Sequence, residues 1–258
     1  MRKVVSRDGT TIAYRSAGEG LPIVLVNGAF RDHTIFDPLV PELVAHCTVY
    51  VYDRRGRGHS GDCPGYAVER EVEDLAAVIE EAGGQAVVFA GSTGANLALE
   101  AALAGVGVTK LALHEPYFRT LGHPKPPADC MDVLRALLAQ GRRGEAAQYW
   151  LSELLGLSAE VIAEWRQAPL WATNEANAHT LLYDTAILGD FEVPVARLAA
   201  LRTPAVVLSS DASSDWLRDA ARATAAALPN GFGMQLPGSW HRIDTPILGR
   251  VLAGFATT

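Results

Sequence analysis

The chain has 258 residues, of which 49% are hydrophobic and 20% charged, a composition typical of a globular protein with a sizeable core. Its 29 acidic and 22 basic side chains give a formal net charge of −7, which argues against a dedicated nucleic-acid binder. The cysteines, Cys47, Cys63 and Cys130, form neither a disulfide framework nor a CxxC metal pair. Because the sequence shows no signal-peptide core and no membrane-spanning apolar run, we expect a cytoplasmic protein.

Short apolar, β-branched runs alternate with helical patterns along most of the chain. The Asp8-Gly9 pair between two such runs predicts a β-hairpin, and residues 68–82 carry the apolar stripe of a helix. The other predicted strands are Ile23–Val26, Val49–Tyr52, Ala86–Ala90, Lys110–His114, Ala205–Leu208 and Phe232–Leu236. Nearly continuous apolar runs are typical of parallel strands covered on both faces. The pattern therefore predicts an α/β fold with a mostly parallel sheet flanked by helices.

The alternation stops at Pro116 and resumes after about residue 195. The intervening chain contains helix-forming segments at 131–139, 144–155 and 159–167 and no convincing strand. We therefore expect a core of residues 1–115 and 196–258, with a helical cap or lid of residues 116–195 inserted after the sixth strand. Such a cap would cover the carboxyl edge of the sheet, where open α/β sheets bind ligands. The alternative is an ordinary helical layer of the main domain.

The strongest local motif places Ser92 between a buried strand and a helix, over residues 87–99. Small residues around it, including Ala90 and Gly94, let the strand and helix pass closely. The N-terminus of the helix favours negative charge beside Ser92, and the Thr93 amide is positioned to donate to an oxyanion. Ser92 is thus a candidate nucleophile, although a serine that only caps the helix would give the same pattern.

Three other loops follow predicted strands. Residues 53–61 combine glycines and arginines without the spacing of a phosphate-binding loop, and predict a structural polar network. The turn that begins with Asn27-Gly28 offers backbone amides that can complete an oxyanion hole opposite Thr93. His241 follows the last strand at the same sheet edge as Ser92, which makes it a candidate general base; the alternative is a solvated surface histidine.

The ordered set of motifs resembles the α/β-hydrolase superfamily, in its serine-nucleophile, cap-containing branch, over nearly the whole chain. The motifs are Asn27-Gly28, Asp53-x-Arg55-Gly56-x-Gly58-x-Ser60, Ser92-x-Gly94 and His241. The resemblance implies that Ser92 is the nucleophile and His241 the base. It also implies that the oxyanion hole consists of the amides of Thr93 and of Ala29 or Phe30. The sequence departs from the family pattern at Asn27, where a histidine is usual, and at Ala90, where the elbow motif has glycine.

The acid of the triad is the larger departure. In the family it is normally an aspartate after the penultimate strand, and the usual register falls here near Ser213. Asp211 and Asp215 lie on either side of it, but Asp215 is better suited to cap the helix over residues 216–227. Some family branches take the acid from the end of the strand after the nucleophile helix, which corresponds to Glu115. We place Glu115 ahead of Asp211.

These residues predict a serine hydrolase that cleaves a small carboxylic ester, lactone or thioester through an acyl-enzyme on Ser92, without a metal or an organic cofactor. The alternative on the same scaffold is a carbon–carbon hydrolase, or a lyase or cyclase of a biosynthetic pathway; a non-enzymatic receptor ranks third. The expected partner is a small-molecule substrate, not nucleic acid or membrane, and the oligomeric state stays open. Aromatic residues of the cap predict either an apolar pocket or the cap's own core: Tyr117, Phe118, Tyr149, Trp150, Trp165, Trp171 and Tyr183.

Overall fold

The computed structural model describes residues 1–258, which form an eight-stranded sheet in the order β1-β2-β4-β3-β5-β6-β7-β8. The strands are β1 (Arg2–Val5), β2 (Thr11–Ala17), β3 (Leu21–Val26), β4 (Cys47–Tyr52), β5 (Ala86–Gly91), β6 (Val108–His114), β7 (Ala205–Ser210) and β8 (Gly231–Leu236). Antiparallel pairing is confined to β1 with β2 and β2 with β4, and all other neighbours are parallel. The predicted α/β fold is confirmed, with every predicted strand in place.

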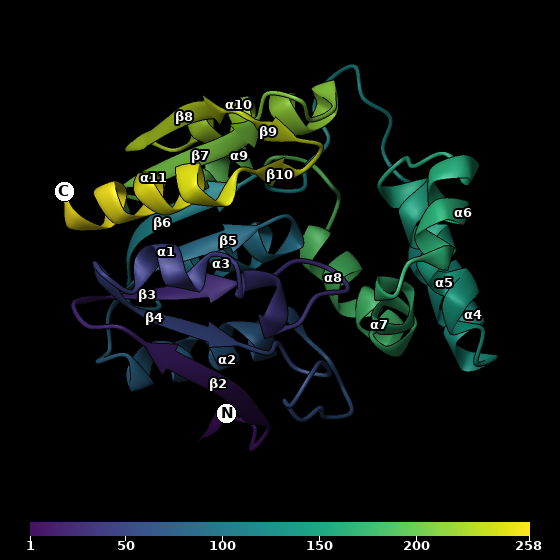
Figure 1. Ribbon diagram of the computed structural model, residues 1–258. Coiled ribbons are helices and arrows are strands. Elements are labelled where there is room, and N and C mark those ends of the chain that lie inside the picture. The colour runs from purple at the N-terminus through teal and green to yellow at the C-terminus, as the bar shows by residue number, and fades with distance from the viewer.

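Helices cover both faces of the sheet (Figure 1). On one face α2 (Val68–Glu81), α3 (Thr93–Leu103) and α10 (Asp215–Ala227) bury their apolar sides in a single cluster with the strands. On the other face α1 (Val40–Leu43), a 3-10 turn η1 (His33–Phe36) and α11 (Thr245–Thr257) do the same. Side chains alternate between the two faces of a strand, so β3 contributes Val24 to the first cluster and Leu25 to the second.

The chain between β6 and β7 is helical. It contains α4 (Cys130–Ala139), α5 (Arg143–Tyr149), a π-helical turn η2 (Trp150–Leu154), α6 (Ala159–Gln167), α7 (Leu170–Ala176), a 3-10 turn η3 (Ala178–Thr180), α8 (Leu181–Leu188) and α9 (Val195–Leu198). Figure 1 shows α4 to α7 grouped to one side of the sheet. These helices bury a third apolar cluster of their own, which Phe30 joins from the turn after β3. They therefore lie over the carboxyl ends of the strands.

Two details of this segment differ from the sequence expectation. Residues 144–155 do not form one helix, because the chain widens into the π-helical turn at Trp150, and the helices α7 and α8 are absent from the predicted segments.

None of the helices in the protein combines the length and the apolar character that a bilayer crossing requires.

Candidate active site

Ser92 occupies a strained turn between β5 and α3. Its φ and ψ are 56° and −131°, a left-handed conformation that a side-chain-bearing residue adopts only at an energetic cost. The turn is possible because Gly94 has no side chain: a Cβ there would lie 2.5 Å from the carbonyl oxygen of Asn27. Although Ser92 is the N-cap residue of α3, its hydroxyl makes no capping hydrogen bond. The capping interpretation is therefore wrong, and Ser92 instead lines a cavity.

The turn after β3 lies directly against Ser92. A Cβ on Gly28 would lie 2.9 Å from Ser92 Cβ and 3.5 Å from its Oγ, so only glycine fits at this position. Ala29 and Phe30 line the same cavity as Ser92, and Phe30 has a φ of 65°. Thr93 is fully buried, but because it opens α3 its backbone N–H belongs to the first helical turn, whose amides have no partner within the helix.

His241 and Glu115 are brought together from distant parts of the chain. His241 lies in the tight turn between β9 (Gly238–Ser239) and β10 (Arg242–Ile243), and its Nδ1 is 2.5 Å from Glu115 Oε2. The other carboxylate oxygen of Glu115 accepts a hydrogen bond of 2.8 Å from the Ser210 amide at the end of β7. Burial alone would raise the pKa of Glu115, but the hydrogen bond from His241 and the nearby imidazoles lower it to about 2. Glu115 is therefore an ionised, fully buried partner of His241.

The other proposed acids point elsewhere. Asp211 is exposed and accepts a hydrogen bond from the Gly238 amide, so it supports the turn before β9 rather than the imidazole. Asp215 is an exposed first residue of α10 that pairs with Arg218; the N-cap is Ser214, which corrects the predicted capping role of Asp215. At the family's usual register, Ser213 Oγ accepts a hydrogen bond of 2.9 Å from the His241 backbone amide. Ser213 thus fixes the loop that carries the histidine.

His114, the last residue of β6, is a site residue that the sequence did not predict. Its ring stacks on that of His241, with centroids 5.4 Å apart and planes 19° apart. Its Nε2 is buried without a hydrogen-bond partner and lies 3.8 Å from Glu115 Oε2. Burial, and then the charge of His241, lower the pKa of His114 to about 4. His114 is therefore neutral at pH 7 and presents an apolar ring face to His241.

A buried ionic network links the serine turn to the turn after β3. Asp184 of α8 accepts hydrogen bonds from Arg54, Arg57 and the Thr93 hydroxyl at 2.8, 2.6 and 2.6 Å. Arg57 also donates to the Gly28 carbonyl oxygen at 2.6 Å. Burial alone would raise the pKa of Asp184, but Arg57 and Arg54 hold it below its ordinary value. The network fixes the positions of both turns, and the sequence did not predict the part that Asp184 has in it.

The arginine-rich loop is structural, as the sequence predicts, but its pairing differs in detail. Asp53 bonds the His33 ring and the amides of His33 and His59 rather than an arginine. Arg54 and Arg55 pair with carboxylates of α2, at Glu71 and Asp74.

Ser92, the candidate nucleophile, lines a cavity of about 540 Å³. The other lining residues come from the carboxyl edge of the sheet and from the helical segment. Ser92, His114 and His241 are among the lining residues of this cavity. Of the aromatic residues expected in the helical segment, only Trp150 and Trp165 line this cavity. Tyr117 and Trp171 are buried in the cluster of the helical segment and Phe118 in a cluster of the sheet, so these three serve cores.

Two groups of side chains offer metal-ligating atoms within 4.8 Å of one another: His114, Glu115 and His241, and Asp32, His33 and Asp53. In the first group Glu115 Oε2 and His241 Nδ1 bond each other, and in the second His33 Nδ1 bonds Asp53 Oδ1. Hydrogen bonding within each group therefore accounts for its geometry.

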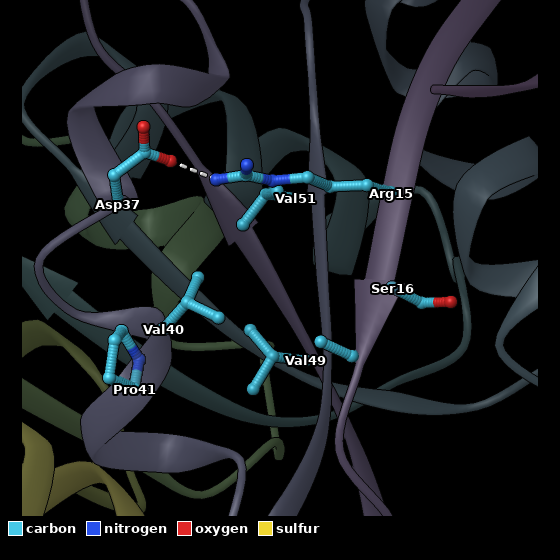
Figure 2. Close-up of a pocket in the computed structure, with 8 residues that line it drawn as sticks. Arg15, Ser16, Asp37, Val40, Pro41, Val49 and Val51 are labelled. Atoms are coloured by element: carbon cyan, nitrogen blue, oxygen red, sulfur yellow. Dashed lines mark hydrogen bonds and ion pairs between the residues drawn. The ribbon is translucent and has the colours of Figure 1, made fainter.

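A second pocket, of about 290 Å³, lies between β2, β4 and α1 (Figure 2). Arg15 reaches across it to Asp37, and Val40, Val49 and Val51 form its apolar wall. It contains a serine but no histidine or cysteine, so it lacks the nucleophile–base pair of the first cavity.

The fold, the serine turn and the buried carboxylate–histidine pair are those of a known class. Residues 23–250 match the model of the α/β hydrolase family, and the chain belongs to this family. It is 45% identical to an α/β hydrolase from Sphaerobacter thermophilus DSM 20745, with a TM-score of 0.95, over 98% of this chain and 99% of that one.

More distant structures share the fold. A thermophilic esterase from Thermogutta terrifontis is 24% identical, with a TM-score of 0.74, over 98% of this chain and 96% of that one. The enol-lactonase from Burkholderia xenovorans LB400 is 21% identical, with a TM-score of 0.73, over 100% of both chains. No curated protein matches the sequence. These two structures show the fold, and membership in the family together with the Sphaerobacter thermophilus hydrolase supports a hydrolase.

Proposed function

We propose that the protein is a serine hydrolase that cleaves a small carboxylic ester, lactone or thioester through an acyl-enzyme on Ser92. The observation that carries the proposal is the bond between buried Glu115 and His241 Nδ1, on a histidine that lines the same cavity as Ser92. A carboxylate on Nδ1 holds the proton there and leaves Nε2 free to accept one. Both Ser92 and His241 line the pocket that a substrate would enter, as the mechanism requires.

In the proposed reaction Ser92 Oγ attacks the carbonyl carbon while His241 Nε2 takes the hydroxyl proton. His241 then returns that proton to the leaving alcohol or thiol as its bond to the acyl carbon breaks. A water molecule, deprotonated by the same imidazole, attacks the acyl-enzyme, and the proton passes to Ser92 as the acid is released. Glu115 stays ionised throughout and stabilises the imidazolium that forms twice in each cycle.

For the oxyanion hole we propose the backbone amides of Thr93 and Ala29. The Gly28 carbonyl oxygen is directed at Arg57, and no peptide bond of the chain is cis. In a trans peptide the N–H points opposite to the carbonyl, so the Ala29 amide is directed away from Arg57. A preorganised amide of this kind stabilises charge at the carbonyl oxygen without reorganisation. Phe30, the other candidate, has no such constraint on its amide.

We also propose that residues 116–195 act as the cap that shapes the substrate pocket. Trp150 and Trp165 from this segment line the cavity beside Ser92. Two features would favour the carbon–carbon hydrolase, lyase or cyclase alternative: a displaced acid and the Asn27 turn. Glu115 bonds His241 Nδ1, and Asn27 bonds the Tyr52 carbonyl oxygen and Arg57, so neither feature supports this alternative.

The proposal is tested by intact-mass analysis after exposure to a fluorophosphonate, together with turnover of short-chain 4-nitrophenyl esters. We expect one adduct, on Ser92, and loss of both adduct and turnover in Ser92→Ala with little change in thermal stability. The matched control is Ser16→Ala, in the second pocket, which should retain both. An unlabelled, folded wild-type protein would refute the acyl-enzyme mechanism.

A further inference from the structure

Two arginines line the active-site cavity, and no carboxylate does. The charged side chains among the lining residues, apart from the histidines, are Arg31 and Arg242. No aspartate or glutamate lines the cavity, although the chain has 29 acidic residues against 22 basic ones. The lining is therefore positive in a protein whose net charge is negative, which sets this cavity apart from the average surface.

Arg31 follows the turn that flanks Ser92. Its guanidinium donates one hydrogen bond, of 3.2 Å, to the side-chain oxygen of the buried Asn174 in α7, and it forms no ion pair. The charge of its sequence neighbour Asp32 acts on Arg31 from a distance, but the two side chains form no ion pair, and Asp32 Oδ1 accepts from the amide and the hydroxyl of Thr34. Burial, and then the charge of Arg242, lower the pKa of Arg31, and the charge of Asp32 partly opposes them. The guanidinium therefore keeps donors free and lies within electrostatic reach of a second positive charge.

Arg242 immediately follows His241. Its backbone is held by pairing with Ser239 in the β9–β10 hairpin, and its guanidinium has no ion pair and no hydrogen bond to another side chain. The two guanidiniums thus come from the loops that carry the oxyanion turn and the base. Two like charges without an ion-pair partner repel each other, and an anion bound by both would offset that repulsion and gain charge-assisted hydrogen bonds.

We propose that the substrate carries an ionised carboxylate, separate from the scissile bond, which Arg31 and Arg242 bind together. This inference rests on the proposed serine hydrolase function and specifies its substrate class: an anionic ester or lactone. The cavity, of about 540 Å³, is otherwise mostly apolar, with Trp150 and Trp165 among its lining residues. An apolar chain between the carboxylate and the scissile carbonyl suits such a lining, because the charged end alone needs polar partners.

The first experiment compares three acyl chains of matched length on one leaving group: mono-4-nitrophenyl adipate, 4-nitrophenyl hexanoate and 4-nitrophenyl 6-aminohexanoate. We expect kcat/KM for the adipate to exceed that for the hexanoate by about 10- to 100-fold, the equivalent of a charge-assisted hydrogen bond, and the amine to be the poorest. A second pair places the charge on the alcohol: the acetyl ester of 3-(4-hydroxyphenyl)propionate against that of its primary amide. Equal rates within both series would overturn the proposal.

The second experiment measures Arg31→Gln and Arg242→Gln against Arg250→Gln, which removes an exposed charge from α11 outside the cavity. Each cavity variant should lose most of the preference for the anionic ester, measured as the ratio of its kcat/KM to that of the neutral ester, whereas Arg250→Gln should keep that ratio. Arg31→Lys, which keeps the charge, should retain part of the preference. Equal losses on neutral and anionic esters would contradict the assignment.

The two proposals fail differently. Absence of Ser92 labelling and of turnover on every ester would refute the proposed function. Labelling and turnover of the neutral hexanoate, without any advantage for either anionic ester, would refute only the anion site.

Discussion

Replacing Glu115 by glutamine changes one atom of the buried pair, and the surrounding hydrogen bonds dictate how the new side chain must lie. The Ser210 amide donates to Glu115 Oε1, so the amide oxygen of the glutamine must stay on that side. Its NH₂ group then faces His241 Nδ1, which bonds the other carboxylate oxygen in the wild type. A donor facing Nδ1 forces the imidazole into the tautomer with its proton on Nε2. In that tautomer His241 cannot accept the proton of Ser92.

The expected loss follows from this tautomer and from the missing negative charge. In the serine-protease triad, the corresponding substitution of the acid leaves the histidine in the wrong tautomer and lowers kcat by about 10⁴-fold. Because Glu115 is fully buried and the orientation of the amide is fixed by Ser210, we expect a loss of about 10³- to 10⁴-fold in kcat for Glu115→Gln. KM should change little, since the substituted group does not line the cavity.

The assay is steady-state hydrolysis of a neutral 4-nitrophenyl ester, with near-UV circular dichroism and thermal melting to establish that the variant is folded. Asp211→Asn is the matched control: its carboxylate is exposed and bonds only the Gly238 amide, so its kcat should stay within a fewfold of the wild type. A folded Glu115→Gln enzyme with turnover within about tenfold of wild type would contradict this reasoning. A large loss confined to Asp211→Asn would do so as well.

Three further substitutions test the scaffold and the pocket. Asp184→Asn leaves two buried guanidiniums without their shared carboxylate and should lower the free energy of unfolding in urea by about 3–5 kcal/mol, whereas Arg197→Gln, which breaks an exposed pair, should cost less than about 1 kcal/mol. Trp165→Ala, which enlarges the cavity, should shift acyl-chain preference more than the rate of fluorophosphonate labelling, and Tyr149→Ala, outside the cavity, should shift neither. The pKa of His114 falls from 6.5 to about 4 on folding, so the unfolded chain takes up a proton first as the pH drops. The folded state therefore has its full stability with respect to this group above pH 6.5, and loses roughly 3 kcal/mol of it as the pH falls towards 4. In His114→Phe, the free energy of unfolding in urea should depend less on pH across this range.

The sheet was predictable because its strands are short, almost continuously apolar and separated by strong turn signals. The run that ends at Val26, for example, is buried on both faces, and such a short continuous apolar run is typical of a central parallel strand. The helices after Pro116 were harder to delimit. The π-helical turn at Trp150 and the short helix α7 depend on how Trp150 and Trp171 pack in their shared cluster. Local helix propensity does not predict this tertiary packing.

Side chains that act at a distance in sequence could not be predicted in the same way. Asp184 is the one charged residue of an otherwise mostly apolar helix, and its function depends on Arg54, Arg57 and Thr93, the nearest of which is 91 residues away. Arg31 reads as an ordinary loop arginine, and only the cavity shows that it lacks a carboxylate partner. A buried charge in an apolar helix is a usable signal, since such a residue almost always has an ionic partner, but the sequence does not say which one.

The choice of acid shows where the limit lies. Strands β6 and β7 are parallel neighbours, and the Glu115 amide bonds the Leu208 carbonyl oxygen, so the residues that follow the two strands emerge side by side. A carboxylate from either strand end can therefore approach the same imidazole, and the sequence leaves both possible. Local hydrogen bonds determine which carboxylate pairs with His241: Asp211 accepts from the Gly238 amide, and Ser213 accepts from the His241 amide. With those positions occupied by structural bonds, Glu115 is the carboxylate that reaches Nδ1. The same geometry explains why a serine at the usual register is compatible with a complete triad: its hydroxyl orients the histidine loop while the neighbouring strand supplies the charge.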